Sequence, residues 1–176
     1  PKDRFHLYRS VWNEDKPTLH VLPHWNWKGR EGQKTPVHVY TSYPSAELFV
    51  NGKSQGKRSK AMPSGMTPEP ERTTKERFCL MWDDVVYQPG ELKVIAYDQN
   101  GTKAMTRIVR TAGKAASIRL TPDRNIMDAD GEDLCFINVS VIDENGYPVP
   151  ADNRLINVKV SGAGSFKAMA NGDPSC

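Results

Sequence analysis

Residues 36–52 read PVHVYTSYPSAELFVNG, and the pattern of this stretch predicts β-strands and a hairpin turn. Val37 to Thr41 alternates with a period of two, which is typical of a half-buried strand. A second run, Ala46 to Val50, leads directly into Asn51-Gly52. Because both residues of an Asn-Gly turn tolerate positive φ, this dipeptide after a hydrophobic strand predicts a tight β-hairpin.

Strand-like runs continue on the C-terminal side of this hairpin. Three more of them lie at Phe78–Trp82, Glu91–Tyr97 and Met105–Val109. Pro89-Gly90 and Asn100-Gly101 supply turns between them, and residues 61–74, rich in Pro, Met and Ser, are expected to form a loop. About six or seven short strands in roughly 95 residues predict an immunoglobulin-like β-sandwich.

The small residues Thr111 to Ala116 mark a boundary, after which the strand pattern restarts. Further strands are expected at Ser117–Leu120, Leu134–Val141 and Ile156–Val160. This part covers only about 60 residues, whereas a complete immunoglobulin-type sandwich takes about 100. We therefore expect a second sandwich that lacks its closing strands at the C-terminal side.

Helical periodicity replaces the strand pattern at the N-terminus. Phe5, Tyr8, Val11 and Trp12 recur at three- and four-residue steps. A helix this short is marginal alone and needs a surface against which its aromatic side can be buried. The predicted fold class is therefore all-β: tandem immunoglobulin-like β-sandwiches over residues 15–112 and 113–176, the second incomplete, preceded by a short helical segment over residues 1–14.

Composition excludes several classes of function. The 176 residues include 24 Lys and Arg against 21 Asp and Glu, a net charge of +3, and the basic residues 53–60 have no interleaved aromatics. Nucleic acid is therefore not an expected partner. No long apolar run is present, so we expect no membrane span.

The residue types that bind metals or perform catalysis lack the spacing of known motifs in this sequence. The cysteines at 79, 135 and 176 lack zinc-ligand spacing, and the first two lie in apolar runs typical of core thiols. Asp128, Asp130 and Asp133 could ligate calcium, but their spacing differs from an EF-hand, and turn formation is the favoured interpretation. No nucleophile, zinc-protease or phosphate-loop motif occurs. We expect no cofactor, no metal and no catalytic residue within this chain.

The segment from Leu19 to Trp27 carries the densest aromatic signal. His24, Trp25, Asn26 and Trp27 offer flat apolar faces with polar edges. Three interpretations remain open: a docking surface for a neighbouring domain, a platform on which sugars stack, and plain core packing. With Trp12, these four are the candidate docking or sugar-stacking residues.

This segment, LPHWNWKGREG at 22–32, resembles the chain that follows the catalytic barrel in bacterial family 2 glycoside hydrolases of the β-galactosidase type. The resemblance continues, in family order, at 37–41, 46–54, 82–85, 89–93, 96–98, 111–113, 129–134, 160–164 and 171–174. It covers nearly the whole chain.

The resemblance implies a role for each part. Residues 1–12 are similar to the last helix of the catalytic (β/α)8 barrel, and the two modules to the immunoglobulin-like modules after it. The resemblance implies a non-catalytic C-terminal fragment that supports the barrel. Its parent would hydrolyse terminal β-D-galactosides with retention and is expected to be periplasmic or secreted. The alternative is an accessory carbohydrate-binding module that binds a β-galactoside or polysaccharide.

Overall fold

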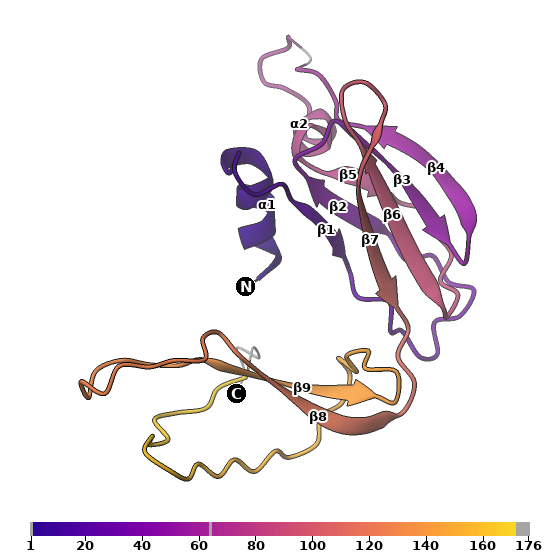
Figure 1. Ribbon diagram of the computed structural model, residues 1–176. Coiled ribbons are helices and arrows are strands. Elements are labelled where there is room, and N and C mark those ends of the chain that lie inside the picture. The colour runs from indigo at the N-terminus through magenta and orange to yellow at the C-terminus, as the bar shows by residue number, and fades with distance from the viewer. Residues whose placement is uncertain (1, 64, 172–176) are drawn as a thin grey trace.

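A computed structural model of the chain describes residues 2–63 and 65–171 (Figure 1). Cys176 and the end of the resemblance, 172–174, lie outside the described residues. The elements in chain order are α1 (Asp3–Trp12), β1 (Leu19–Leu22), β2 (Val37–Thr41), β3 (Ser45–Val50), β4 (Lys53–Ser59), α2 (Glu71–Phe78), β5 (Leu80–Trp82), β6 (Glu91–Tyr97), β7 (Lys103–Arg110), β8 (Ala115–Pro122) and β9 (Ile137–Asp143). The expected all-β class, with its N-terminal helix, is confirmed.

The first seven strands form two facing antiparallel sheets. One sheet has the order β1-β2-β5 and the other β4-β3-β6-β7. Their inner side chains interdigitate in one core, in which Val37, Val39, Leu48, Leu92 and Val94 are fully buried. This is the expected sandwich, since alternate residues of each strand point into the space between the sheets.

The hairpin predicted at Asn51-Gly52 joins β3 to β4. Asn51 has φ 47° and Gly52 has φ 81°, so both adopt the left-handed conformation that the turn requires. In addition, the Asn51 side chain accepts a hydrogen bond from the Glu91 amide at 2.7 Å and donates one to the Pro89 carbonyl at 3.0 Å. The turn is thereby tied to the start of β6.

One expectation for the middle of the chain is wrong. The loop ends at Pro70, and Glu71–Phe78 forms α2, so Phe78 ends a helix instead of opening a strand. The helix ERTTKERF has no apolar stripe that periodicity could detect. Ion pairs one turn apart support it instead: Arg72 with Glu76 at 2.5 Å, and Lys75 with Glu71 at 2.6 Å.

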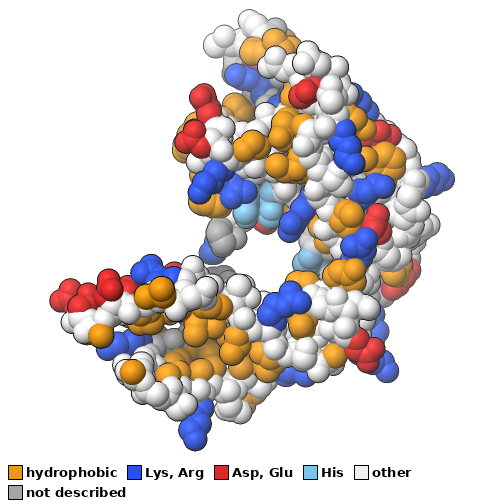
Figure 2. Space-filling model, in the orientation of Figure 1, with side chains coloured by type: hydrophobic (Ala, Val, Ile, Leu, Met, Phe, Trp, Pro, Cys, Tyr) orange, Lys and Arg blue, Asp and Glu red, His pale blue; other side chains and the backbone are white. Residues whose placement is uncertain are grey.

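The second module contains one pair of antiparallel strands, β8 and β9. In its register Ile118 pairs with Val141 and Leu120 with Val139, so one face of this ribbon is apolar. That face is open: Ile118 is 49% and Leu120 62% exposed. In Figure 2, hydrophobic side chains gather in the lower part of the view, where Figure 1 places the ribbon and the segment after it.

The strand expected at Ile156–Val160 is not formed, and no strand follows Asp143 up to residue 171. Leu155 is 86% exposed and Val160 45%. An isolated strand has no partner for its backbone hydrogen bonds, so alternation alone does not stabilise it. The expected lack of closing strands beyond this segment stays a prediction.

Candidate functional site

The first part of the candidate site is α1, which is fastened to the sandwich along one side. Asp3 Oδ1 lies 2.8 Å from His20 Nε2 on β1, and Arg9 Nε donates to Thr18 Oγ1 at 2.9 Å. The rings of His6 and His20 stack with their centroids 3.9 Å apart. Burial, together with the charges of His20 and Arg9, lowers the pKa of His6.

The opposite side of α1 is apolar and open. Phe5 is 48%, Tyr8 50% and Trp12 74% exposed, and the Tyr8 and Trp12 rings stack with centroids 4.8 Å apart. With Arg9 and Asn13 these residues line a shallow depression. Large exposed aromatic side chains that adjoin each other are typical of an interface. The sequence-predicted Trp12 is thus placed at an open apolar surface.

The second part of the candidate site is the segment around Trp25, and here the structure corrects the expected docking or stacking role of that residue. Trp25 is completely buried in the core of the sandwich. Its ring meets Tyr87 edge-to-face with centroids 5.0 Å apart, and its Nε1 donates to the Gln88 carbonyl at 2.9 Å. With both faces covered, Trp25 offers nothing to a sugar or a neighbouring domain. The core interpretation is the one that fits this residue.

Trp27 and His24 lie nearer the surface. Their rings stack with centroids 4.3 Å apart, and the Arg30 guanidinium lies 5.4 Å from the centre of the Trp27 ring. Trp27 packs against the edge of the core and its backbone amide donates to the Tyr87 hydroxyl at 3.2 Å. Within the described residues, the buried Nε1 of Trp27 has no hydrogen-bond partner.

Asn26 joins this segment to the boundary between the modules. Its Oδ1 accepts a hydrogen bond from the Ala112 amide at 2.7 Å. Beside it, the Thr111 hydroxyl donates to the Trp25 carbonyl at 2.6 Å and accepts from the Gly90 amide at 3.1 Å. The predicted aromatic segment and the predicted boundary are therefore one structure, in which short polar side chains hold the linker against the end of the sandwich.

Asp143, the last residue of β9, completes this junction. The residue is 3% exposed. Its carboxylate accepts three hydrogen bonds from backbone amides, those of Gly113 at 2.7 Å, Tyr147 at 2.8 Å and Asn145 at 2.9 Å. These donors, the Gly113 amide foremost, lower the pKa of the Asp143 carboxyl. A charged Asp143 thus fixes the linker to the end of β9.

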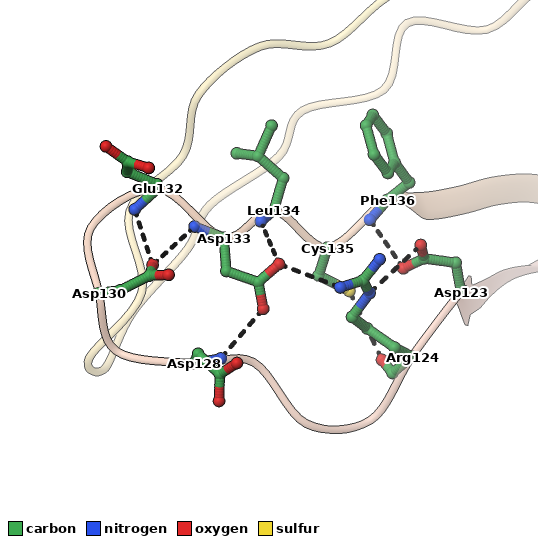
Figure 3. A network of polar contacts seen from close by, with 9 residues as sticks. All are labelled: Asp123, Arg124, Asp128, Asp130, Glu132, Asp133, Leu134, Cys135 and Phe136. Carbon is green, nitrogen blue, oxygen red and sulfur yellow. Dashed lines mark hydrogen bonds and ion pairs between the residues drawn. The ribbon is translucent and has the colours of Figure 1, made fainter.

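The acidic loop between β8 and β9 is held by its own backbone (Figure 3). Asp130 Oδ1 accepts from the amides of Glu132 and Asp133, both at 2.8 Å. Asp133 accepts from the Asp128 amide at 3.0 Å and from Arg124 Nη1 at 3.0 Å. Over residues 2–63 and 65–171, no group of three His, Cys, Asp or Glu side chains is arranged to hold a metal ion. These carboxylates act as turn formers.

Of the two cysteines described, Cys79 is buried, as expected, and burial raises the pKa of its thiol to about 11. Cys135 is wrongly expected in the core: it is partly exposed, because it precedes β9 in the acidic loop, where its Sγ lies 3.5 Å from the Arg124 carbonyl. Neither helix among the described residues has the length and apolar character needed to cross a bilayer.

Known protein families match both modules. A domain of unknown function, DUF4982, matches residues 32–105, and the glycoside hydrolase family 2 C-terminal domain 5 matches residues 118–176. A β-galactosidase of Bacteroides ovatus, BoGH2A, is 42% identical over 99% of this chain and 18% of its own length. A β-glucuronidase of Formosa agariphila is 27% identical over 97% of this chain and 16% of its own length. The chain thus spans less than a fifth of the length of these relatives.

Solved structures agree with the sequence matches. A β-glycosidase from Bacteroides vulgatus superimposes with a TM-score of 0.68 and 31% identity, covering 85% of this chain and 17% of that one. A family 2 glycosyl hydrolase from Bacteroides cellulosilyticus gives a TM-score of 0.66 and 31% identity, covering 84% of this chain and 20% of that one. In each case the similar part is a small portion of a much longer chain.

Proposed function

The chain belongs to the C-terminal region of glycoside hydrolase family 2 proteins, and from this premise we propose that it supports the catalytic barrel of its parent without taking part in the chemistry. The exposed aromatic side of α1 carries this proposal. α1 is anchored to β1 through Asp3 and Arg9, while Phe5, Tyr8 and Trp12 are turned away from the sandwich. A helix fixed on one side and apolar on the other is suited to join two bodies.

The proposed partner of this surface is the (β/α)8 barrel of the parent chain. Trp12, at 74% exposure, would lie near the centre of the contact, and burial of such a ring is worth about 2–3 kcal/mol. The junction at Asn26, Thr111 and Asp143 would then fix the direction in which the second module leaves the sandwich. In this proposal Trp25 contributes through the core of the supporting module.

We propose that the parent hydrolyses terminal β-D-galactosides with retention of configuration. The support is the 42% identity to a β-galactosidase, against 27% to a β-glucuronidase. The groups that perform such hydrolysis are a pair of carboxylates on a rigid scaffold. The expected periplasmic or secreted location stays a prediction.

The first experiment is hydrolysis of a chromogenic β-galactoside and the matching β-glucuronide. The 176-residue chain should release no chromophore from either, while the parent should prefer the galactoside. Turnover by the 176-residue chain would contradict the supporting role, and a preference of the parent for the glucuronide would contradict the substrate.

The second experiment tests the docking surface in the parent. Trp12→Ala should lower the melting temperature of the parent, whereas the matched change Trp12→Phe should lower it much less. In the 176-residue chain, Trp12→Ala should leave the unfolding midpoint unchanged. An unchanged melting temperature of the Trp12→Ala parent would exclude this residue from the docking surface.

The alternative, an accessory carbohydrate-binding module built on Trp25 and Trp27, loses support at Trp25, which has no exposed ring face. Trp27 with His24 stays a candidate for either contact. Titration of galactosides against the chain and its Trp27→Ala variant separates the two, because binding that depends on Trp27 favours the module.

A further inference from the structure

The outer face of the four-stranded sheet carries a second set of aromatic side chains, away from α1 and from the junction. On β3 and β6 every second residue is buried in the core, which turns Glu47 and Phe49, and Lys93, Ile95 and Tyr97, outward. In the register of the two strands, Glu47 pairs with Ile95 and Phe49 with Lys93. α1 packs on β1 and β2, and α2 on β5, so neither helix covers this face (Figure 1).

Each ring on this face lies beneath a lysine of another strand, Lys93 from the adjacent β6 and Lys57 from β4, which reaches across β3. Lys57 Nζ on β4 is 4.3 Å from the centre of the Tyr97 ring, and Lys93 Nζ is 5.0 Å from that of Phe49. Lys103 on β7 is in register with Tyr97. Among the described residues none of these three lysines forms an ion pair with a carboxylate. Within the described residues, the three ammonium groups of this face are therefore not held in ion pairs, although the Glu47 carboxylate shares the face with them.

Glu47 supplies a fixed acceptor between the two rings. Its Oε1 accepts from the Ser54 hydroxyl at 2.6 Å and its Oε2 from the Tyr97 hydroxyl at 3.2 Å. Each carboxylate oxygen has a further lone pair to offer. The rings themselves lie far apart along the sheet: Tyr97 is in register with Ser45, four residues from Phe49, which corresponds to about 14 Å. A ligand that meets both rings is therefore an extended chain.

We propose that this face, formed by Phe49, Lys57, Lys93 and Tyr97 around Glu47, binds an oligosaccharide that contains uronic acid residues. A sugar ring has an apolar C–H face for stacking on Tyr97 and Phe49, and hydroxyl groups that donate to Glu47. A uronate carboxylate pairs with Lys57 or Lys93, either of which can leave its ring on a flexible stem. A neutral sugar would leave these charges unpaired, and a simple polyanion would leave the rings unused.

This inference rests on the proposed function, since it assumes that the parent acts on carbohydrate. On that basis the outer face of the four-stranded sheet would hold an acidic polysaccharide while the barrel removes its β-galactoside ends. The two proposals can fail separately, because binding to this face is tested with the 176-residue chain and hydrolysis is tested with the parent.

The test is calorimetric titration of the 176-residue chain with an oligogalacturonate of about six residues, a neutral cello-oligosaccharide of the same length, and inorganic polyphosphate. Saturable binding is expected for the oligogalacturonate, with at least tenfold weaker binding of the other two. Raising the salt from about 0.05 M to 0.5 M should weaken the binding, since exposed charges are screened. No saturation by oligogalacturonate, or equal binding of the neutral chain or of polyphosphate, would overturn the proposal.

Variants locate the site. Tyr97→Ala should weaken binding roughly tenfold, the size of a lost stacking contact, whereas Tyr97→Phe should retain most of it. Phe136→Ala, which removes an exposed ring from the second module, is the control and should bind as the unaltered chain does. The double change Lys57→Gln with Lys93→Gln keeps both stems and rings and should abolish the preference for the acidic chain. If both altered proteins fold, by circular dichroism, and bind unchanged, the site lies elsewhere.

Discussion

The two modules share the same alternating sequence pattern but differ in how far their apolar side chains are buried. In the first, Leu48 of one sheet is completely buried because a second sheet lies opposite. In the second, Leu120 lies on the apolar face of the β8–β9 ribbon, opposite no other sheet, and is 62% exposed. Alternation thus determines which side chains share a face, while burial of that face needs an opposing layer. Four measurements on the 176-residue chain test this difference between the modules.

The largest effect is expected from a core tryptophan compared with a surface one. Trp25→Ala should destabilise the first module by about 3–5 kcal/mol, because it leaves a cavity and an unpaired Gln88 carbonyl. Trp12→Ala, at 74% exposure, should change the free energy of unfolding by less than about 0.5 kcal/mol. Urea denaturation followed by circular dichroism measures both. Equal effects would mean that Trp25 is not part of the core.

A leucine pair compares the modules directly. Leu48→Ala should cost about 2–5 kcal/mol, whereas Leu120→Ala should stay within about 0.5 kcal/mol. The two substitutions delete the same atoms, so the difference reports the opposing sheet alone. A large loss at Leu120 in the same denaturation assay would show that the ribbon is covered in solution.

The turn between β3 and β4 should give a smaller effect. Gly52 has φ 81°, and alanine disfavours that conformation by about 1 kcal/mol, so Gly52→Ala should lower the free energy of unfolding by that amount. There is open space around an added Cβ, so backbone strain is the whole cause. Asn51→Gly removes the hydrogen bonds to Glu91 and Pro89 without placing a Cβ at positive φ, and losses that add in the double variant would show that the two causes are separate.

The smallest effect is expected at Asp143 and is local. Its pKa is lowered in the folded chain, so its contribution is present above the unfolded value of about 4 and is lost as the pH falls below it. Hydrogen exchange at the Gly113 and Tyr147 amides should therefore accelerate as the pH falls below about 4, beyond the change in the intrinsic rate. Asp143→Ala should accelerate it at neutral pH, while amides of β3 and β6 stay protected. Unaltered exchange at Gly113 in that variant would contradict the junction.

Local patterns were enough to predict α1, the strands β2, β3, β5, β6 and β7 of the first module, and the Asn51-Gly52 turn. Each rests on residues that are close together in the chain: a three-to-four-residue step, a two-residue step, or a dipeptide that tolerates positive φ. α2 was not predicted, because ion pairs one turn apart support it and it has no apolar stripe. β1 and β4 were not predicted, because β1 has only four residues and β4, KSQGKRS, is polar and lacks an apolar alternation.

For the candidate site, too, local sequence patterns predict some features and tertiary packing establishes the others. The amino-acid sequence predicts that His24 to Trp27 is an unusual aromatic segment and that the small residues Thr111 to Ala116 mark a boundary. The packing of the fold places Trp25 in the core and Trp27 and Trp12 nearer the surface, and it joins Asn26 to a residue 86 positions away. Periodicity is a property of neighbours in the chain, whereas the covering of a side chain depends on partners that the fold brings from far along it.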